Sequence, residues 1–221
     1  MPIRRRHRDA DSPLVERITH VVYDGEAGDL ATPDGCWDIV FRRRRGALEV
    51  LQTGIITRPI PLDYECGDEY LCISFKPGVF MPMLPGARML DRAFQRPNDG
   101  HVFVLENDRL EIPSFENAEV MVARLARRGL LTRDDVVTKV LEGEGRAMSP
   151  RSVQRHFRHI LGITPKGLEQ CLRAHRALDL LQGGRTILDV VEDLGFADQA
   201  HLTRSLKRLT GQTPGTVVRS R

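Results

Sequence analysis

The chain has 221 residues, of which 41% are hydrophobic, and a formal net charge of +3 at pH 7. This composition excludes a fully disordered chain and leaves room for two domains of roughly 100 residues each. Because the sequence contains no apolar run of about 18 residues and no secretory leader, we expect no membrane association and a cytoplasmic location.

The first nine residues contain four arginines. A short run of like charges is typical of a solvated tail, so we predict that residues 1–12 form a disordered basic tail that can touch phosphate non-specifically.

Residues 13–113 are predicted to form a small, mostly antiparallel β domain. Four short runs with β-branched or aromatic residues are separated by Gly, Pro and Asp, namely Arg17 to Tyr23, Cys36 to Arg42, Ala47 to Thr53 and Tyr70 to Phe75. The segment from Arg42 to Gly46 is interpreted as a charged hairpin. Its arginines would protect the sheet from edge association, and a second phosphate-binding patch is the alternative.

Aromatic residues of this β domain are candidates for an apolar ligand pocket, although aromatic residues on strands more often belong to a core. The candidates are Trp37, Tyr64, Tyr70 and Phe75. His20 and His101 are isolated, so no metal site is predicted. No nucleophile motif, phosphate-binding loop or dinucleotide fingerprint is present, so we predict neither a cofactor nor an enzyme.

The four cysteines, at positions 36, 66, 72 and 171, show neither a CxxC pair nor metal-finger spacing. We therefore expect free and mostly buried thiols. A redox pair formed by Cys66 and Cys72 is the alternative.

Residues 114–131 are predicted to form a connecting helix that ends near Gly129. Val120, Met121 and Leu125 are expected on its inner face, with Ala118 and Val122 as further candidates. The helix either covers one open end of the β domain or mediates dimerisation.

The last 90 residues contain the same pattern twice, which is a capped basic helix followed by Gly-x-Thr-Pro. In the first copy Ser149 and Pro150 are start signals, and Gly162 is an end signal. An apolar stripe is formed by Val153, Phe157, Ile160 and Leu161, and the opposite face carries Arg151, Gln154, Arg155 and Arg158.

In the second copy Asp198 is the expected N-cap. Its apolar stripe is Leu202, Leu206 and Leu209, and its polar face carries Gln199, Ala200, Thr203, Arg204 and Lys207.

Each basic helix follows a shorter apolar helix, as in a helix-turn-helix unit. The segment from Thr186 to Phe196 precedes the second basic helix, and Asp134 to Leu141 precedes the first. A long helix from Pro165 to Gln182 connects the two units. The first unit departs from the usual three- or four-residue turn, because Glu142 to Met148 is longer and carries two acidic residues.

Charge distribution agrees with a nucleic-acid partner. Residues 132–221 hold 15 Lys and Arg against 10 Asp and Glu, whereas residues 1–131 hold 18 against 20. The excess of positive charge therefore belongs to the duplicated region, as an electrostatic footprint on phosphate requires. A basic amphipathic helix by itself is as consistent with a solvated surface. The repetition and its order favour DNA binding.

This region resembles the DNA-binding domain of AraC/XylS-type transcription regulators. The resemblance depends on Ser149 to Pro165, Arg173 to Leu181, Ile187 to Phe196, and Asp198 to Pro214 with Gln199, His201, Leu202 and Arg204. Two N-terminal segments, Pro33 to Phe41 and Cys72 to Gly78, resemble the cupin-like domains of some of these regulators. The likeness implies a seven-helix domain at residues 132–221 and a sensing or dimerising β domain.

The resemblance also implies that two recognition helices enter successive major-groove segments, roughly 34 Å apart. Arg forks onto guanine and Gln onto adenine, and an Ala side chain can contact a thymine methyl. Base contacts are expected from Arg151, Gln154, Arg155, Gln199, Ala200, Thr203 and Arg204. Phosphate contacts are expected from Arg158, His201, Lys207 and Arg208.

The sequence thus predicts an α+β regulator that binds double-stranded DNA. A small-molecule effector, a homodimer and RNA polymerase are further partners that the residues leave open. Two alternatives also stay open, namely a ligand-independent regulator whose N-terminal half only dimerises or docks a partner, and an enzyme fused to a DNA-binding module.

Overall fold

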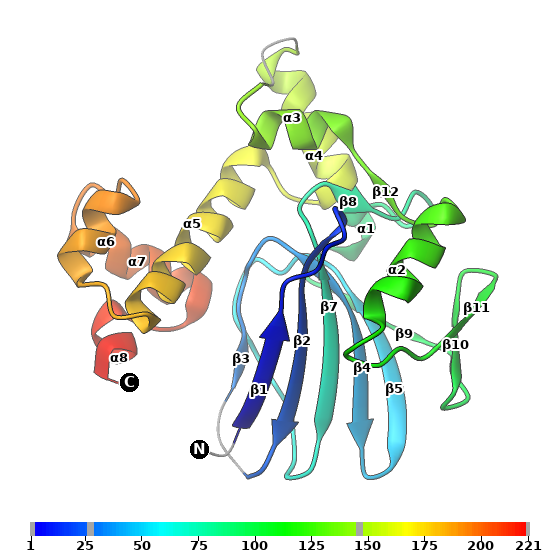
Figure 1. Cartoon of the computed structure of the whole chain (residues 1–221). Helices are drawn as coiled ribbons and strands as arrows, with labels where there is room; N and C mark the ends of the chain where they lie inside the picture. The colour runs from blue at the N-terminus through cyan, green and yellow to red at the C-terminus, as the bar shows by residue number, and fades with distance from the viewer. Residues whose placement is uncertain (1–2, 26–28, 145–147, 220–221) are drawn as a thin grey trace.

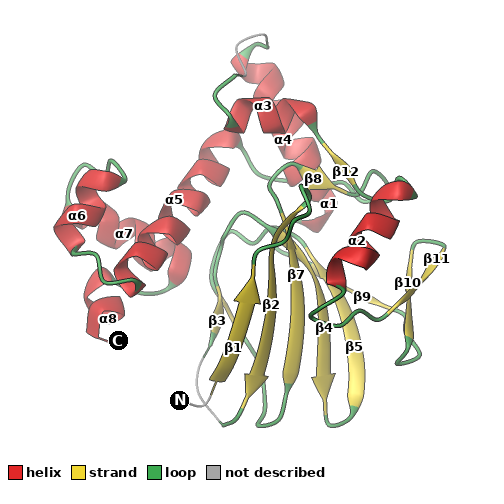
Figure 2. Cartoon of the chain, viewed as in Figure 1, coloured by secondary structure: helices red, strands yellow, loops and turns green. Residues whose placement is uncertain are grey.

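The computed structural model describes residues 3–25, 29–144 and 148–219. An N-terminal half built on an antiparallel sheet precedes a helical C-terminal half (Figures 1 and 2), so the predicted α+β class and its order are confirmed. None of the helices in these three ranges has the length and apolar character that crossing a membrane requires.

The main sheet has six antiparallel strands in the order β1-β2-β7-β4-β5-β9. These strands are β1 (Ile3–Arg8), β2 (Val15–Tyr23), β4 (Trp37–Arg44), β5 (Ala47–Thr53), β7 (Glu69–Phe75) and β9 (Ala93–Arg96). Three small pairs accompany it, made of β3 (Leu30–Ala31) with β6 (Ile60–Pro61), β8 (Val79–Phe80) with β12 (Thr132–Arg133), and β10 (Val102–Leu105) with β11 (Asp108–Glu111). The four predicted runs coincide with β2, β4, β5 and β7.

The predicted charged hairpin joins β4 to β5. Its two turn residues, Arg45 and Gly46, have φ angles of 50° and 81°, the left-handed values that a tight two-residue hairpin requires. Ion pairs use the hairpin's charge internally, since Arg42 pairs with Glu49 and Arg44 with Asp63 and Asp68. These pairs argue against the alternative of a second phosphate patch.

The prediction of a disordered tail over residues 1–12 is wrong for Ile3–Arg8. These residues form β1, an edge strand paired with β2 from Ile3 opposite Tyr23 to Arg8 opposite Ile18. Three acidic side chains, Asp24, Asp29 and Glu119, accept ion pairs from its arginines. A charge run becomes a strand here because the fold supplies the carboxylates that the local sequence lacks.

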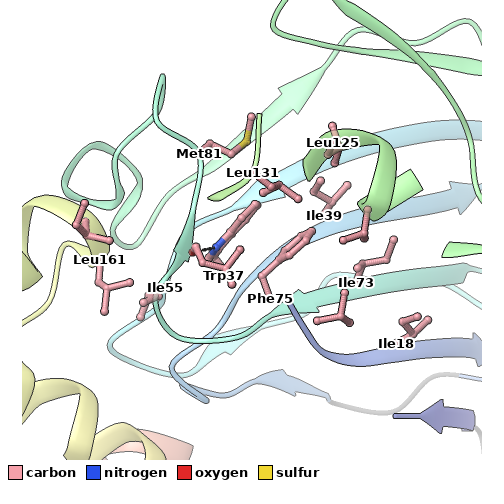
Figure 3. Packing of buried hydrophobic residues seen from close by; sticks show 14 of the residues in the cluster. Ile18, Trp37, Ile39, Ile55, Ile73, Phe75, Met81, Leu125, Leu131 and Leu161 are labelled. Atoms are coloured by element: carbon pink, nitrogen blue, oxygen red, sulfur yellow. Dashed lines mark hydrogen bonds between the residues drawn. The ribbon is translucent and has the colours of Figure 1, made fainter. Parts of the chain in front are cut away.

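The two faces of the sheet carry different apolar clusters. Trp37, Ile39 and Phe75 lie in the main core, which Figure 3 shows in detail, whereas Val40 and Tyr70 belong to a small cluster on the opposite face. Helix α2 (Ala118–Arg127) covers the main core with four buried residues, namely Ala118, Met121, Val122 and Leu125.

The buried face of α2 supports the prediction that this helix covers the β domain. The expectation that Val120 points inward is wrong, because this residue is 67% exposed. The further candidates Ala118 and Val122 do lie on the covered side, together with Met121 and Leu125.

Six helices follow in the described part of the C-terminal half, one fewer than the resemblance implies. They are α3 (Asp135–Leu141), α4 (Pro150–Leu161), α5 (Pro165–Gln182), α6 (Ile187–Asp193), α7 (Gln199–Thr210) and α8 (Pro214–Arg219). A shorter helix, α1 (Gly86–Met89), belongs to the β domain and packs against α4.

The main core does not stop at the boundary between the halves. Buried residues of α4 and of the N-terminal half of α5 belong to the same cluster as the sheet, among them Phe157, Ile160, Leu168 and Cys171. A separate cluster is formed by the C-terminal half of α5 with α6, α8 and most of α7, whose Leu209 belongs to the main core. Figure 1 shows α5 extending from the top of the β domain to this second cluster.

Candidate nucleic-acid interface

Helix α4 has both ends fixed by local interactions. The Ser149 hydroxyl accepts the Ser152 N–H at 3.2 Å, and Gly162 takes the left-handed conformation at φ 78° that closes a helix. The predicted apolar stripe is buried, from Val153 to Leu161. On the other side the predicted polar residues Arg151, Gln154, Arg155 and Arg158 are all exposed. The sequence therefore predicted correctly which face is available for contact.

Helix α7 repeats this design. The Asp198 carboxylate accepts the His201 N–H at 2.6 Å, and Gly211 ends the helix at φ 74°. Leu202, Leu206 and Leu209 are buried. Of the predicted base-contacting residues, Gln199, Ala200 and Arg204 are exposed, while Thr203 is half-buried and donates its hydroxyl to the Gln199 carbonyl at 2.8 Å. That bond leaves the Thr203 methyl as the group suited to contact a base.

The exposed faces of α4 and α7 carry positive charge. Neither helix contains Asp or Glu. Within the described ranges, five cations of these helices take part in no ion pair, namely Arg151, Arg155, Arg158, Arg204 and Lys207. By contrast, most arginines of the main sheet are paired with carboxylates. Unpaired cations on a helix face are available to replace the counterions of a polyanion.

Two predicted phosphate contacts have intramolecular partners instead. The Arg208 guanidinium donates to the Gln170 side chain of α5 at 3.0 Å. The His201 ring packs edge-on against Phe196, and its Nδ1 accepts the Ala197 N–H at 3.3 Å. The structure thus uses these two side chains to hold α7 to its surroundings, and their contact with phosphate stays a prediction.

The turns before the two basic helices differ. In the second unit Gly195 has a φ angle of 65°, and the Phe196 N–H bonds to the Val191 carbonyl at 2.9 Å, which closes a short turn. In the first unit part of the predicted long turn, residues 145–147, lies outside the described residues. Glu142, one of its two acidic residues, pairs with Arg133 at 3.2 Å, which reduces its charge toward a nearby phosphate.

The four aromatic residues predicted to line a ligand pocket are divided between the two faces of the sheet. Trp37 and Phe75 stack at 4.2 Å within the main core, whereas Tyr64 and Tyr70 pack around Tyr23 on the other face. Trp37 borders a cavity of about 20 Å³, enough for one water molecule, and its indole N–H donates to the Val79 carbonyl at 2.7 Å. These residues therefore do not converge on one site.

A half-buried carboxyl group on strand β4 contacts two hydroxyl groups of neighbouring strands. The Asp38 carboxylate accepts hydrogen bonds from Ser74 at 2.6 Å and from Thr53 at 3.1 Å. Burial raises the pKa of Asp38 to about 6, and the negative charge of Asp34 adds to the rise. In the described part of the chain no group of three or more His, Cys, Asp or Glu side chains could hold a metal ion.

All four cysteines are free, as predicted, and Cys36 and Cys171 are buried. Cys66 is exposed and Cys72 is half-buried. Burial raises the pKa of the Cys72 thiol to about 12, which keeps it protonated and poorly reactive. A redox pair with Cys66 is therefore disfavoured.

Sequence reasoning assigned no role to His156 of α4 or to the carboxylate of Asp134. The structure brings them together, with the imidazole Nε2 2.8 Å and 2.9 Å from the two carboxylate oxygens. The position of Asp134 before a helix signals an N-cap, but no local pattern connects it with a histidine 22 residues later.

Comparisons with known proteins agree with this geometry. Residues 146–220 match the family described as a helix-turn-helix domain. The regulatory protein Ada of Salmonella typhimurium is 33% identical over 84 residues, and the bifunctional transcriptional activator/DNA repair enzyme Ada of Escherichia coli is 31% identical over 84 residues. Each match covers 38% of this chain but only 24% of the relative.

Two solved structures of ToxT from Vibrio cholerae are similar along 98% and 99% of this chain and 97% of each ToxT chain. The sequence identity is 10%, and the TM-scores are 0.41 and 0.39. A likeness this remote supports no argument about the chain.

Proposed function

We propose, from the match of residues 146–220 to a helix-turn-helix family, that the protein is an AraC-type transcription regulator that binds double-stranded DNA in a sequence-specific manner. Its two recognition helices, α4 and α7, read successive segments of the major groove. Their centres on the DNA lie roughly one helical turn apart.

The observation that supports this proposal best is that α4 and α7 have the same arrangement of a buried apolar face and an exposed basic face. Each helix buries one apolar stripe and exposes Arg and Gln on the other side, with no acidic residue in the helix. A merely solvated surface has no need for two acid-free faces, because interspersed charges of both signs serve solubility as well. Arg and Gln are also the residues that read guanine and adenine edges in the major groove.

Selection of bound sequences from a random pool of duplex DNA tests the proposal. We expect the full chain to enrich two short motifs whose centres are about 10 base pairs apart. A suitable control is Arg127→Ala on α2, which removes one exposed positive charge, without an ion pair among the described residues, from a helix outside both helix-turn-helix units. This variant should enrich the same motifs. A pool that shows no enrichment at moderate salt would contradict sequence-specific binding.

The N-terminal half supports the ligand-independent alternative more than a sensor. The aromatic residues considered for a pocket are divided between two faces, and the cavity beside Trp37 holds about 20 Å³. The β domain then serves as a scaffold for the first helix-turn-helix unit. A thermal-shift screen against metabolites distinguishes the two, because a specific ligand at 100 times its Kd stabilises the folded state by about 2.7 kcal/mol. We expect no such shift.

The name of the Escherichia coli relative includes DNA repair, but that match covers only 84 residues of this chain and a quarter of the relative. The sequence contains no nucleophile motif, phosphate-binding loop or dinucleotide fingerprint. We therefore propose a regulator without enzymatic activity. Binding to RNA polymerase and formation of a homodimer are open extensions of the same proposal.

A further inference from the structure

The first helix-turn-helix unit begins as part of the β domain. Strand β12 pairs with β8, placing Thr132 opposite Phe80 and Arg133 opposite Val79. The next residue, Asp134, donates its backbone N–H to the Gly78 carbonyl at 2.8 Å. The start of α3 is thereby tied to a loop whose neighbour Val79 is fully buried in the main core.

The Asp134 side chain has two partners. One carboxylate oxygen accepts the Val137 N–H at 2.8 Å and so caps α3. The same carboxylate pairs with His156 Nε2 at 2.8 and 2.9 Å from its two oxygens. The two side chains are 13% and 29% exposed, so the pair is largely shielded from water. His156 occupies the middle of α4, directly after the expected base-contacting residue Arg155.

We propose that Asp134 and His156 are positioning residues for DNA recognition, which set the orientation of α4 relative to both α3 and the β domain. This inference rests on the proposed function, and it assigns one contact through which the N-terminal half determines how the first recognition helix meets DNA. Neither side chain needs to contact DNA itself.

The second unit lacks this connection. Its first helix, α6, is capped by Thr186, whose hydroxyl accepts the Asp189 N–H at 3.2 Å. Across the described residues no hydrogen bond joins Thr186 to α7. The two units therefore provide an internal comparison, since loss of the Asp134 and His156 pair should affect α4 and leave α7 unchanged.

Hydrogen exchange of the full chain without DNA tests the positioning directly. We expect His156→Ala to raise amide exchange in residues 150–161, and to leave residues 199–210 at the wild-type rate. His156→Gln retains a side-chain N–H donor and should restore most of the protection. His159→Ala removes an exposed histidine of the same helix and is the matched control. Unchanged exchange of α4 in His156→Ala would overturn the inference.

DNA binding supplies the second readout, on the operator that the selection experiment yields. His156→Ala and Asp134→Asn should each reduce discrimination at the half-site read by α4 by on the order of tenfold, with discrimination at the α7 half-site retained. Asn still caps a helix, so Asp134→Asn removes the charge and keeps α3. Loss at both half-sites to the same degree, with a native melting temperature, contradicts positioning of α4.

The two readouts separate the possible failures. If the wild-type chain shows no sequence preference, the proposed function is wrong, and the exchange experiment still decides whether the pair holds α4. If the preference exists but His156→Ala leaves it intact, the positioning role is wrong and the proposed function stands.

Discussion

The two helix-turn-helix units have similar recognition helices but are supported in different ways. The first unit shares one core with the sheet, through residues such as Phe157 and Ile160, whereas the second has its own core around Val190, Leu202 and Leu206. The first recognition helix is therefore part of the β domain in packing terms. A repeated sequence pattern specifies the exposed face of each helix, and the surroundings of its buried face decide how firmly that helix is held.

Replacing a large buried side chain by alanine in each core should give the largest difference between the two units. Phe157→Ala removes a fully buried ring from the shared core and should cost about 4 kcal/mol of the free energy of unfolding, spread over the sheet and the first unit. Leu202→Ala should cost about 3 kcal/mol and act mainly on the second unit. Urea unfolding followed by hydrogen exchange measures both effects. Equal loss of protection in the two units for both variants would refute separate cores.

A substitution at the contact between α1 and α4 is expected to have the next largest effect on the free energy of unfolding. A Cβ atom at Gly86 would lie 2.4 Å from the Ile160 carbonyl oxygen and 2.5 Å from the Leu161 carbonyl carbon, and these backbone atoms cannot move aside cheaply. We expect Gly86→Ala to cost about 3 kcal/mol, measured by urea unfolding.

Gly215→Ala is the matched control, because this helical glycine faces only the flexible end of Arg219 at 3.7 Å. Its effect on the free energy of unfolding should be neutral or slightly stabilising. Similar costs for the two variants would show that α4 does not dock closely on the β domain.

Base recognition by the second unit should show an intermediate effect. Arg204→Ala should cost about 2 kcal/mol of binding free energy and relax preference at one base pair of one half-site. Arg155→Ala should do the same in the other half-site. Affinity for operator variants changed at single positions measures this. A uniform loss on every sequence would contradict base contact by these side chains.

The Asp38 carboxyl predicts a pH effect of smaller size. Its folded-state pKa of about 6 exceeds the ordinary value of 3.8, so the folded state binds the proton more tightly and stability falls as pH rises from about 4 to about 6. Asp38→Asn should remove this dependence and raise the free energy of unfolding at pH 7 by about 1 to 2 kcal/mol. This figure is smaller than the full pKa shift implies, because Asp38 is partly exposed and solvent screens its charge.

Because the first unit shares the sheet's core, this pH effect should be larger in α4 than in α6, whose buried Val190 belongs to the separate cluster. Urea unfolding across the pH range gives the overall effect, and hydrogen exchange at pH 5 and pH 7 gives its location. An Asp38→Asn variant with the wild-type pH profile would show that the carboxyl is not perturbed.

The smallest expected effect distinguishes two neighbouring cations of α7. Lys207 has no partner in the described part of the chain, whereas Arg208 donates to Gln170. Lys207→Ala should flatten the dependence of log affinity on log salt by about one unit. Arg208→Ala should flatten it less, because its guanidinium is already committed to α5. Identical salt slopes for the two variants would argue that the bond to Gln170 opens on DNA.

Local signals made much of this fold predictable. The cap of α4 at Ser149, its end at Gly162 and the cap of α7 at Asp198 depend on residues within one helical turn, and all three have the predicted roles. The strands β2, β4, β5 and β7 were equally visible as short β-branched runs. For the candidate site, the exposed faces of both recognition helices follow from spacing alone.

Interactions between distant segments were not predictable. Strand β1 depends on carboxylates as far away as Glu119, and the aromatic residues were divided because neighbouring strand positions face opposite sides of the sheet. The shared core and the Asp134 and His156 pair likewise join segments that no window of sequence contains. The sequence therefore shows which surfaces are available, and only the structure shows what holds them in place.

The length of helix α5 determines the rotation of the second recognition helix relative to the first. Leu168, Cys171 and Ala174 belong to the first core, and Ala177, Leu178 and Leu181 belong to the second, so a seam falls between Ala174 and Ala177. One residue inserted at this seam would rotate α7 about α5 by about 100° relative to α4, advance it by about 1.5 Å, and move Leu209 of α7 out of the first core, in which it is buried. The angular relation of the two recognition helices is thus encoded in the residue count of a single helix.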